Sequence, residues 1–227
     1  MVSVVIVAAG KGTRMGPNVD KLFLELNGTP VVAHTWQRFD RTACIEHIVL
    51  VIREGMQDAF VALAAKIKPN KPFVLVPGGA ERQDSVWNGL CQLPTNAEIV
   101  VIQDAARPCT SPELTAATVA AARQTGAAVA AQAVTDTIKE SNDGKLVDRT
   151  VDRSRLYAVQ TPQTFRVEVI RQALELVRKK GLSITDDTAA CELIGQPVRL
   201  VLSAAPNPKV TRAEDLPYIE VLLKNHA

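Results

Sequence analysis

The sequence lacks the features that mark several large classes of protein. It has four cysteines, Cys44, Cys91, Cys109 and Cys191, with no Cys-x-x-Cys pair, and three histidines, so buried or unreactive thiols are expected rather than a metal site. No apolar run reaches the length of about 18–20 residues that a membrane span needs, and no signal-type segment opens the chain. We therefore expect a cytoplasmic protein without a membrane partner.

Charge of one sign is also missing. The 26 basic and 24 acidic residues leave a net charge of +2 and form no block of like charge. Because nucleic-acid binding by bulk electrostatics needs a concentrated basic face, no nucleic-acid partner is expected. With 227 residues and 47% hydrophobic content, the chain is long enough for one substantial core. We predict a single domain over residues 1–227.

Short β-branched runs alternate with longer amphipathic stretches along the chain. Strands are predicted at 2–7, 47–52, 73–76, 98–102, 127–133 and 198–202, and helices at 31–39, 56–67, 82–93, 112–124, 167–179 and 186–194. This alternation is typical of an α/β fold with a mostly parallel, Rossmann-like sheet flanked by helices. Ser111 before Pro112 is a predicted N-cap, and Thr211 with Glu214 predicts a capping box for a last helix.

One segment, residues 135–157, breaks this alternation. It is polar and charged, and Asp143-Gly144 lies between two short runs, 136–139 and 146–151, that favour strands. This pattern predicts a hairpin around an Asp-Gly turn. An isolated hairpin is at best marginally stable in water, so we predict a projecting arm that packs against a second subunit.

The loop after the first predicted strand carries glycines and cations. It reads Ala8-Ala9-Gly10-Lys11-Gly12-Thr13-Arg14-Met15-Gly16, and Lys21 follows. Glycines let backbone N–H groups approach an anion closely, and Arg14 and Lys21 add positive charge. The loop lacks the third glycine of the dinucleotide fingerprint and the Gly-Lys-Ser/Thr of a P-loop. The alternative is a tight turn between strand and helix.

Further loops of the same kind lie at 78–85, reading Gly-Gly-Ala-Glu-Arg-Gln-Asp-Ser, at 104–108, reading Asp-Ala-Ala-Arg-Pro, and at 207–211, reading Asn-Pro-Lys-Val-Thr. Each follows a predicted strand, and the carboxyl ends of parallel strands meet at one edge of the sheet. These loops are therefore expected to converge with residues 8–21. Close backbone approach, several cations and the Asp104 carboxylate suit a triphosphate with a magnesium ion. Alternatively, Asp104 caps the turn that follows it.

These ordered blocks, together with 136–137, 150–153, 161–163 and 185–186, resemble the 2-C-methyl-D-erythritol 4-phosphate cytidylyltransferase family through nearly the whole chain. The resemblance implies the fold of the nucleotide-diphospho-sugar transferases and an enzyme of non-mevalonate isoprenoid biosynthesis. Such an enzyme joins CTP and 2-C-methyl-D-erythritol 4-phosphate into 4-diphosphocytidyl-2-C-methyl-D-erythritol and releases pyrophosphate. The substrate phosphate attacks the CTP α-phosphate in line, with Mg²⁺ or another divalent cation as cofactor.

The resemblance also implies a role for each matching residue. The implied catalytic residues are Arg14, Lys21, Arg153 and Lys209, of which the first two would stabilise the transition state. The cytosine and ribose would be surrounded by Ala8, Ala9, Gly10, Gly79 and Ser85, with Asp104 beside the magnesium and the substrate. The sugar-phosphate pocket would be lined by Arg107, Thr161, Thr185 and Lys209, and completed by Thr137 and Arg153 from the arm of a homodimer partner.

Some residues depart from the family pattern. Asp20 stands where proline is common, and pairing with Lys21 would blunt the charge of that lysine; Ala80 replaces a common acidic residue. Pro206 and Pro208 flank Asn207 in the loop before Lys209, which bears on where Lys209 is placed.

Several alternatives stay open. Thr185 is equally suited to be a helix N-cap. The chain could use another polyol phosphate, such as ribitol 5-phosphate, or bind a nucleotide without catalysis. The presence of Arg14, Lys21, Asp104 and Lys209 together favours an enzyme, because a binding module needs no charge for a transition state.

Overall fold

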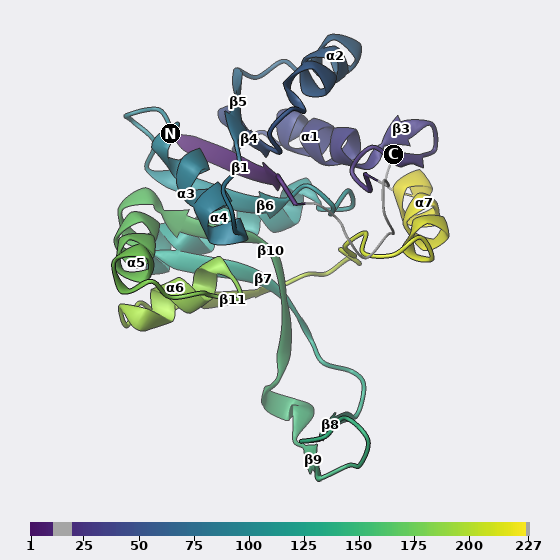
Figure 1. The fold of residues 1–227 in the computed structure, drawn as a ribbon, viewed down its shortest axis with the longest axis vertical. Helices are drawn as coiled ribbons and strands as arrows, with labels where there is room; N and C mark the ends of the chain where they lie inside the picture. Colours follow the sequence, from purple (N-terminus) through teal and green to yellow (C-terminus); the bar gives the residue numbers. More distant parts are fainter. Residues whose placement is uncertain (11–19, 226–227) are drawn as a thin grey trace.

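The computed structural model describes residues 1–10 and 20–225. Its centre is a seven-stranded sheet with the order β11-β7-β10-β6-β1-β4-β5, flanked by helices (Figure 1). The strands are β1 (Val2–Ala8), β4 (His47–Ile52), β5 (Phe73–Pro77), β6 (Ile99–Asp104), β7 (Ala127–Ala133), β10 (Tyr157–Arg166) and β11 (Arg199–Leu202). Strand β10 runs antiparallel to β6 and β7, and the other pairings are parallel. The predicted mostly parallel α/β sheet is confirmed.

Helices cover both faces of this sheet. They are α1 (Val31–Arg41), α2 (Gln57–Ile67), α3 (Arg82–Cys91), α4 (Pro112–Thr125), α5 (Val167–Lys180), α6 (Asp187–Leu193) and α7 (Asp215–Asn225). Ser111 caps α4 as predicted, since its side chain accepts the backbone N–H of Leu114. The capping box predicted for the last helix is wrong: α7 begins at Asp215, whose carboxylate accepts the backbone N–H groups of Thr211 and Arg212. No described helix is long and apolar enough to span a bilayer.

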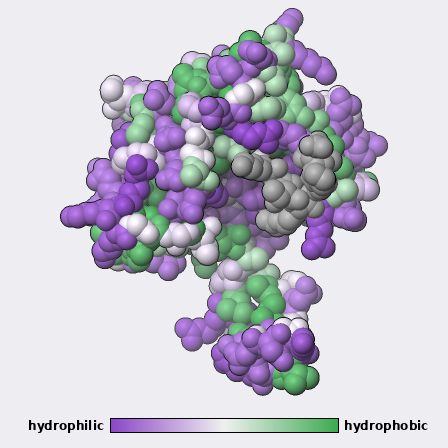
Figure 2. Space-filling model, viewed as in Figure 1, coloured by the Kyte–Doolittle hydropathy of each residue, from purple (hydrophilic) through white to green (hydrophobic). Residues whose placement is uncertain are grey.

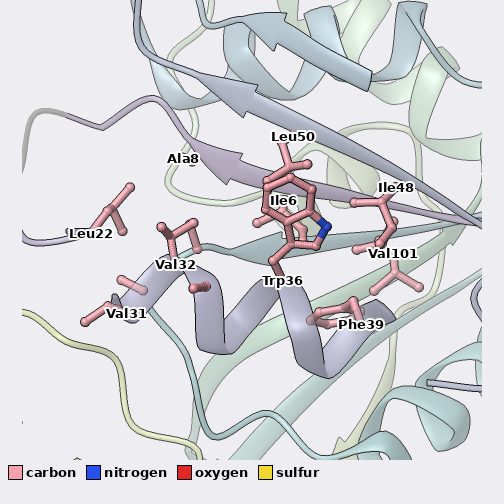
Figure 3. Packing of buried hydrophobic residues seen from close by; sticks show 14 of the residues in the cluster. Ile6, Ala8, Leu22, Val31, Val32, Trp36, Phe39, Ile48, Leu50 and Val101 are labelled. Carbon is pink, nitrogen blue, oxygen red and sulfur yellow. The ribbon is translucent and has the colours of Figure 1, made fainter. Parts of the chain in front are cut away.

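The core consists of two hydrophobic clusters that share the central strand β1. Successive side chains of a strand point to opposite faces, so Ile6 packs with Trp36 and Phe39 of α1 (Figure 3), whereas Val5 belongs to the cluster with α3 and α5. Strands β1, β4 and β6 are buried on both faces, which explains their continuous apolar sequences. The core thereby fixes the strand ends that carry the loops.

Cys109 and Cys191 are buried in the core and Cys44 packs against it, whereas Cys91 is exposed. All four are free thiols, and burial raises the pKa of Cys109 to about 11 and that of Cys191 to about 12. These two thiols therefore stay protonated at neutral pH, as expected for buried cysteines.

Strand β10 was not predicted, because its sequence lacks the continuous apolar run of the other strands. Its pairing register with β7 shifts between Val159 and Gln163, where Pro162 lies. Proline is tolerated in a sheet at such irregularities, since it has no N–H to donate. Residues 157–159 pair with β7 and adjoin the arm, whereas 163–165 pair with both β6 and β7.

The hairpin arm projects from the body of the molecule, as Figures 1 and 2 show. It contains β8 (Ile138–Glu140), β9 (Arg149–Val151) and the 3₁₀-helix Arg153–Arg155. The paired strands are shorter than predicted, because Asp143-Gly144 lies within the connection 141–148, where the Asp143 carboxylate accepts the backbone N–H groups of Lys145 and Leu146. A second, small hairpin joins β2 (Glu25–Leu26) to β3 (Thr29–Pro30).

Candidate active site

Loops from the carboxyl ends of β1, β5 and β6 meet around a cavity of about 360 Å³, called here the first cavity. Its lining includes seven residues that the sequence predicts for the site: Ala9, Gly10, Lys21, Gly79, Ser85, Asp104 and Lys209. Ala8 does not line it, because its side chain is buried in the hydrophobic core. Arg14 lies outside the described residues. The expected convergence of the loops is therefore observed.

A second cavity, of about 270 Å³, lies beside the first. Its lining includes Arg107, Thr161 and Thr185, the residues predicted for the sugar phosphate. Three residues line both cavities: Arg82, Asp104 and Lys209. We call these three the shared wall.

The loop before α3 packs closely against Ala9 and Asp84. An added Cβ at Gly78 would lie 2.3 Å from the Ala9 Cβ, and one at Gly79 would lie 2.3 Å from the Asp84 Cβ. Ser85 Oγ accepts the backbone N–H of Gly79 at 3.0 Å and donates to the Glu81 carbonyl at 3.1 Å. The backbone N–H of Gly78 donates to the Ile52 carbonyl at 2.8 Å, so both glycine N–H groups are used within the protein and the glycines serve the close packing of this loop.

Asp104 is the centre of a cluster of cations. Its Oδ2 lies 2.7 Å from Lys209 Nζ and 3.6 Å from Arg107 Nε, and its Oδ1 lies 3.7 Å from Arg82 Nε. Burial alone would raise the pKa of Asp104, but Lys209, Arg82 and Arg107 lower it below its ordinary value. The carboxylate is therefore ionised and faces the cavities; the alternative in which it caps the following turn is wrong.

The loop before Lys209 is anchored by Asn207, which is 2% exposed. Asn207 donates to the Thr161 carbonyl at 2.8 Å, and its own carbonyl accepts from Arg107 at 2.7 Å. In the described part of the chain, Arg107 Nε has no hydrogen-bond partner, and burial lowers the pKa of this side chain. Pro206 and Pro208 therefore flank an anchored loop that brings Lys209 to Asp104.

Lys21 is held beside the loop that carries Lys209, since its Nζ donates to the Val210 carbonyl at 3.1 Å. Pairing of Asp20 with Lys21 would blunt the charge of that lysine, but Asp20 has other partners. Asp20 instead accepts from Arg53, which follows β4, at 2.7 Å, and accepts the backbone N–H of Leu22. The departure from the family's proline thus ties the Lys21 loop to the end of a central strand.

The comparisons with known proteins agree with this geometry. The model of the family IspD, 2-C-methyl-D-erythritol 4-phosphate cytidylyltransferase, matches residues 2–225. The chain belongs to this family. Two cytidylyltransferases of that name are similar in sequence: that of Pelotomaculum thermopropionicum is 40% identical over 98% of this chain and 94% of the relative, and that of Geobacillus kaustophilus is 42% identical over 96% and 95%.

Solved structures of the same family share the fold. The 4-diphosphocytidyl-2C-methyl-D-erythritol synthase of Anaerococcus prevotii has a TM-score of 0.87 at 31% identity, covering 99% of this chain and 96% of that one. The 2-C-methyl-D-erythritol 4-phosphate cytidylyltransferase of Thermus thermophilus has a TM-score of 0.80 at 32% identity, covering 98% of each chain. The predicted transferase fold is confirmed.

Two of the residues predicted for this cytidylyltransferase site lie on the arm and line neither cavity. Thr137 precedes β8, and Arg153 begins the 3₁₀-helix and donates to the Thr135 carbonyl. A single chain does not bring them to Asp104.

The two threonines predicted from the body of the chain, Thr161 and Thr185, both line the second cavity. Thr161 Oγ1 accepts the backbone N–H of Asp104 at 3.1 Å, so it also fixes the end of β6. Thr185 lines the second cavity, and the N-cap of α6 is Asp186, whose side chain accepts the N–H of Ala189. The alternative role of Thr185 as the N-cap is therefore wrong.

Sequence reasoning missed one ion pair of this cytidylyltransferase. Arg82, the first residue of α3, places its guanidinium 2.8 Å from Oδ2 of Asp187, the first residue of α6. The Asp187 side chain is fully buried. Arg82 was visible as part of the 78–85 loop, but no spacing in the sequence joins it to a residue so far along the chain.

Asp104 and Glu81 are the carboxylates that line the first cavity in the described part of the chain. Within residues 1–10 and 20–225, no group of three or more histidine, cysteine, aspartate or glutamate side chains is arranged to hold one. A protein-only cage for a cation is therefore not found in the described part of the cytidylyltransferase.

Proposed function

We propose that the chain catalyses the reaction for which its family is named, joining CTP and 2-C-methyl-D-erythritol 4-phosphate into 4-diphosphocytidyl-2-C-methyl-D-erythritol and pyrophosphate. The observation that carries the proposal is the pair of adjacent cavities with a shared wall of Arg82, Asp104 and Lys209. In this proposal the first cavity binds CTP and the second binds the acceptor phosphate. We place the reaction in the cytoplasm, as the sequence predicts.

The cavity residues suit a displacement at phosphorus that needs no proton-transfer base. The acceptor phosphate is already an anionic nucleophile, so the protein must align it and offset the charge that develops at the CTP α-phosphate. Lys21 approaches from the first cavity, and Lys209 lies at the boundary between the two. Both cations are held by contacts made before substrate binds, which limits the reorganisation that the reaction requires.

The donor set fits a magnesium ion that is held mainly by nucleotide phosphates. Mg²⁺ is usually bound by one or two carboxylates together with substrate phosphate oxygens, and Asp104 supplies one carboxylate on the shared wall. When bound, such an ion offsets the negative charge of the triphosphate. Lys209, Arg82 and Arg107 already lower the pKa of Asp104, so the carboxylate is available in its charged form.

We further propose that the enzyme is a homodimer in which each arm completes the partner's second cavity. The projection of the arm and its exposed apolar tip, with Leu146 73% and Val147 62% exposed, support this proposal. Placing Thr137 and Arg153 in the partner's site would give both residues a role that they lack within their own chain.

The activity itself is tested by magnesium-dependent release of pyrophosphate from CTP. We expect release with 2-C-methyl-D-erythritol 4-phosphate and none with ribitol 5-phosphate or glycerol phosphate, because the family is named for the first acceptor. Lys21→Ala should abolish release, since Lys21 lines the first cavity. Release with ribitol 5-phosphate alone would show that ribitol 5-phosphate is the acceptor. CTP binding without any turnover would show that the protein binds the nucleotide without catalysis.

Replacing Arg153 with alanine is expected to raise the KM for 2-C-methyl-D-erythritol 4-phosphate about tenfold, because a charged hydrogen bond to a ligand is worth about 1.5–3 kcal/mol. The KM for CTP should stay within about twofold, because Arg153 lines neither cavity of its own chain. Initial rates measure both constants, and Arg155→Ala, on the same 3₁₀-helix, is the matched control. Equal weakening of both substrates would contradict the proposed role.

Sharing of sites between subunits has a separate test. Arg153→Ala subunits mixed with Lys209→Met subunits after dissociation and reassociation should be several times more active than the same subunits unmixed when the acceptor is kept below its wild-type KM, because one site of each mixed dimer then has both native residues. Failure to regain activity in dimers verified as mixed would show that the arm serves its own chain or none.

A further inference from the structure

The Arg82 guanidinium connects three elements that are far apart in sequence. It begins α3, directly after the glycine loop, and its side chain reaches Asp187 at the start of α6 and Asp104 at the end of β6. Each of these elements borders a cavity. The first cavity lies against α3, the second cavity lies against the start of α6, and Asp104 lines both cavities.

The pair of Arg82 and Asp187 joins a partly exposed guanidinium to a buried carboxylate, since the Arg82 side chain is 31% exposed. Asp187 is fully buried, and burial raises its pKa against the opposing effect of Arg82. Asp187 and Asp104 together raise the pKa of Arg82, so the guanidinium stays charged. The backbone N–H of Asp187 donates to Gln163 Oε1 at 3.0 Å, which fixes the start of α6 against β10. Arg82 is therefore held on one side by a rigid anion.

From that position Arg82 competes for the Asp104 carboxylate. It approaches Oδ1, whereas Lys209 and Arg107 both approach Oδ2. Without Arg82, both carboxylate oxygens are free to turn toward Lys209 and Arg107, and each added contact makes those two cations less available to an anionic ligand. Arg82 thereby stays next to Oδ1 of Asp104, while Lys209 and Arg107 stay next to Oδ2.

Resting on the proposed function, we propose that Arg82 is a positioning residue for the acceptor phosphate. It uses Asp187 as a fixed anchor and holds Oδ1 of Asp104, so that only Oδ2 of Asp104 competes with the acceptor phosphate for Lys209 and Arg107 in the second cavity. We expect the larger effect on acceptor binding and alignment, because Arg82 and Lys209 line both cavities but Arg107 lines only the second.

The decisive variant is Arg82→Met combined with Asp187→Leu. Removing one partner of a buried ion pair leaves an uncompensated charge, whereas replacing both by apolar residues of similar size often restores stability. We expect the double variant to keep a Tm within a few degrees of the wild type. Its KM for 2-C-methyl-D-erythritol 4-phosphate should rise at least fivefold and its kcat should fall, with the KM for CTP unchanged within twofold. A double variant with wild-type kcat and KM values would overturn the proposal and leave Arg82 a stabilising residue only.

Two further measurements keep the proposal testable in every case. If the double variant does not fold, Arg82→Lys retains a cation for Asp187 but presents a point charge in place of a planar fork, and it should show the same rise in acceptor KM at a near-native Tm. Arg178→Met is the matched control, because Arg178 pairs with Asp84 of α3 outside both cavities. Native KM values in Arg82→Lys would overturn the proposal.

Binding of inorganic phosphate to the CTP complex, measured by calorimetry, separates this inference from the proposed function. We expect phosphate to bind at least fivefold more weakly to the double variant, or to Arg82→Lys, than to the wild type. Absence of turnover in the wild type would contradict the proposed function but leave this comparison intact. Equal phosphate affinities would contradict the role of Arg82 even in an active enzyme.

Discussion

Replacing Lys209 with methionine is expected to lower kcat by about 10²–10³-fold, the effect of removing one preorganised group that stabilises developing charge. Lys209 Nζ lies 2.7 Å from Asp104 and lines both cavities, so it borders the place where the two substrates meet. Methionine keeps much of the length and apolar surface of the lysine stem. Steady-state pyrophosphate release measures kcat, and calorimetry measures the affinity for CTP.

Folding should change little in this variant. Asp104 keeps Arg82 and Arg107 as cationic neighbours, so no isolated buried charge remains. Lys224→Met, on the exposed surface of α7, is a control for the loss of one positive charge. If Lys209→Met turns over at the wild-type rate, Lys209 stabilises the loop and has no part in the chemistry.

Replacing Gly78 with alanine is expected to weaken CTP binding at least tenfold and to destabilise the fold by about 1–3 kcal/mol, the usual effect of overpacking. The new Cβ would lie 2.3 Å from the Ala9 Cβ and 3.1 Å from Ser85 Oγ. The Ala9 Cβ cannot rotate away, so the glycine loop and the end of β1 must move apart. Calorimetric titration with CTP and thermal unfolding measure the two effects.

A second substitution tests whether this contact is the cause. Ala9→Gly removes the atom that the new Cβ would meet, so Gly78→Ala combined with Ala9→Gly should recover most of the lost Tm. A double variant no more stable than Gly78→Ala alone would assign the loss to backbone conformation at position 78 instead of the contact.

The strands that are buried on both faces could be predicted from the sequence. Strands β1, β4 and β6 lie between two helical layers, so nearly every position is apolar and the run is conspicuous in the sequence. Strand β10 has the opposite character: Thr161, Gln163 and Thr164 are buried but polar. Thr164 Oγ1 bonds Thr118 Oγ1 of α4 at 2.9 Å, and no local pattern reveals such a distant partner.

The candidate site divides in the same way. The parallel sheet brings the loops after β1, β5 and β6 to one edge, so the glycines and Asp104 follow from topology alone. The pairing of Arg82 with Asp187 and the anchoring of Lys209 through Asn207 do not, because each joins residues about a hundred positions apart. These contacts depend on tertiary packing that only the folded chain displays.

The shared wall has a consequence for inhibitor chemistry. Because Arg82, Asp104 and Lys209 border both cavities, only a single layer of side chains separates the two binding spaces at that point. A cytidine fragment and a short polyol phosphate joined by a stable linker would make the second binding event intramolecular, so the linked compound should exceed either fragment in affinity provided that its linker spans the wall without strain.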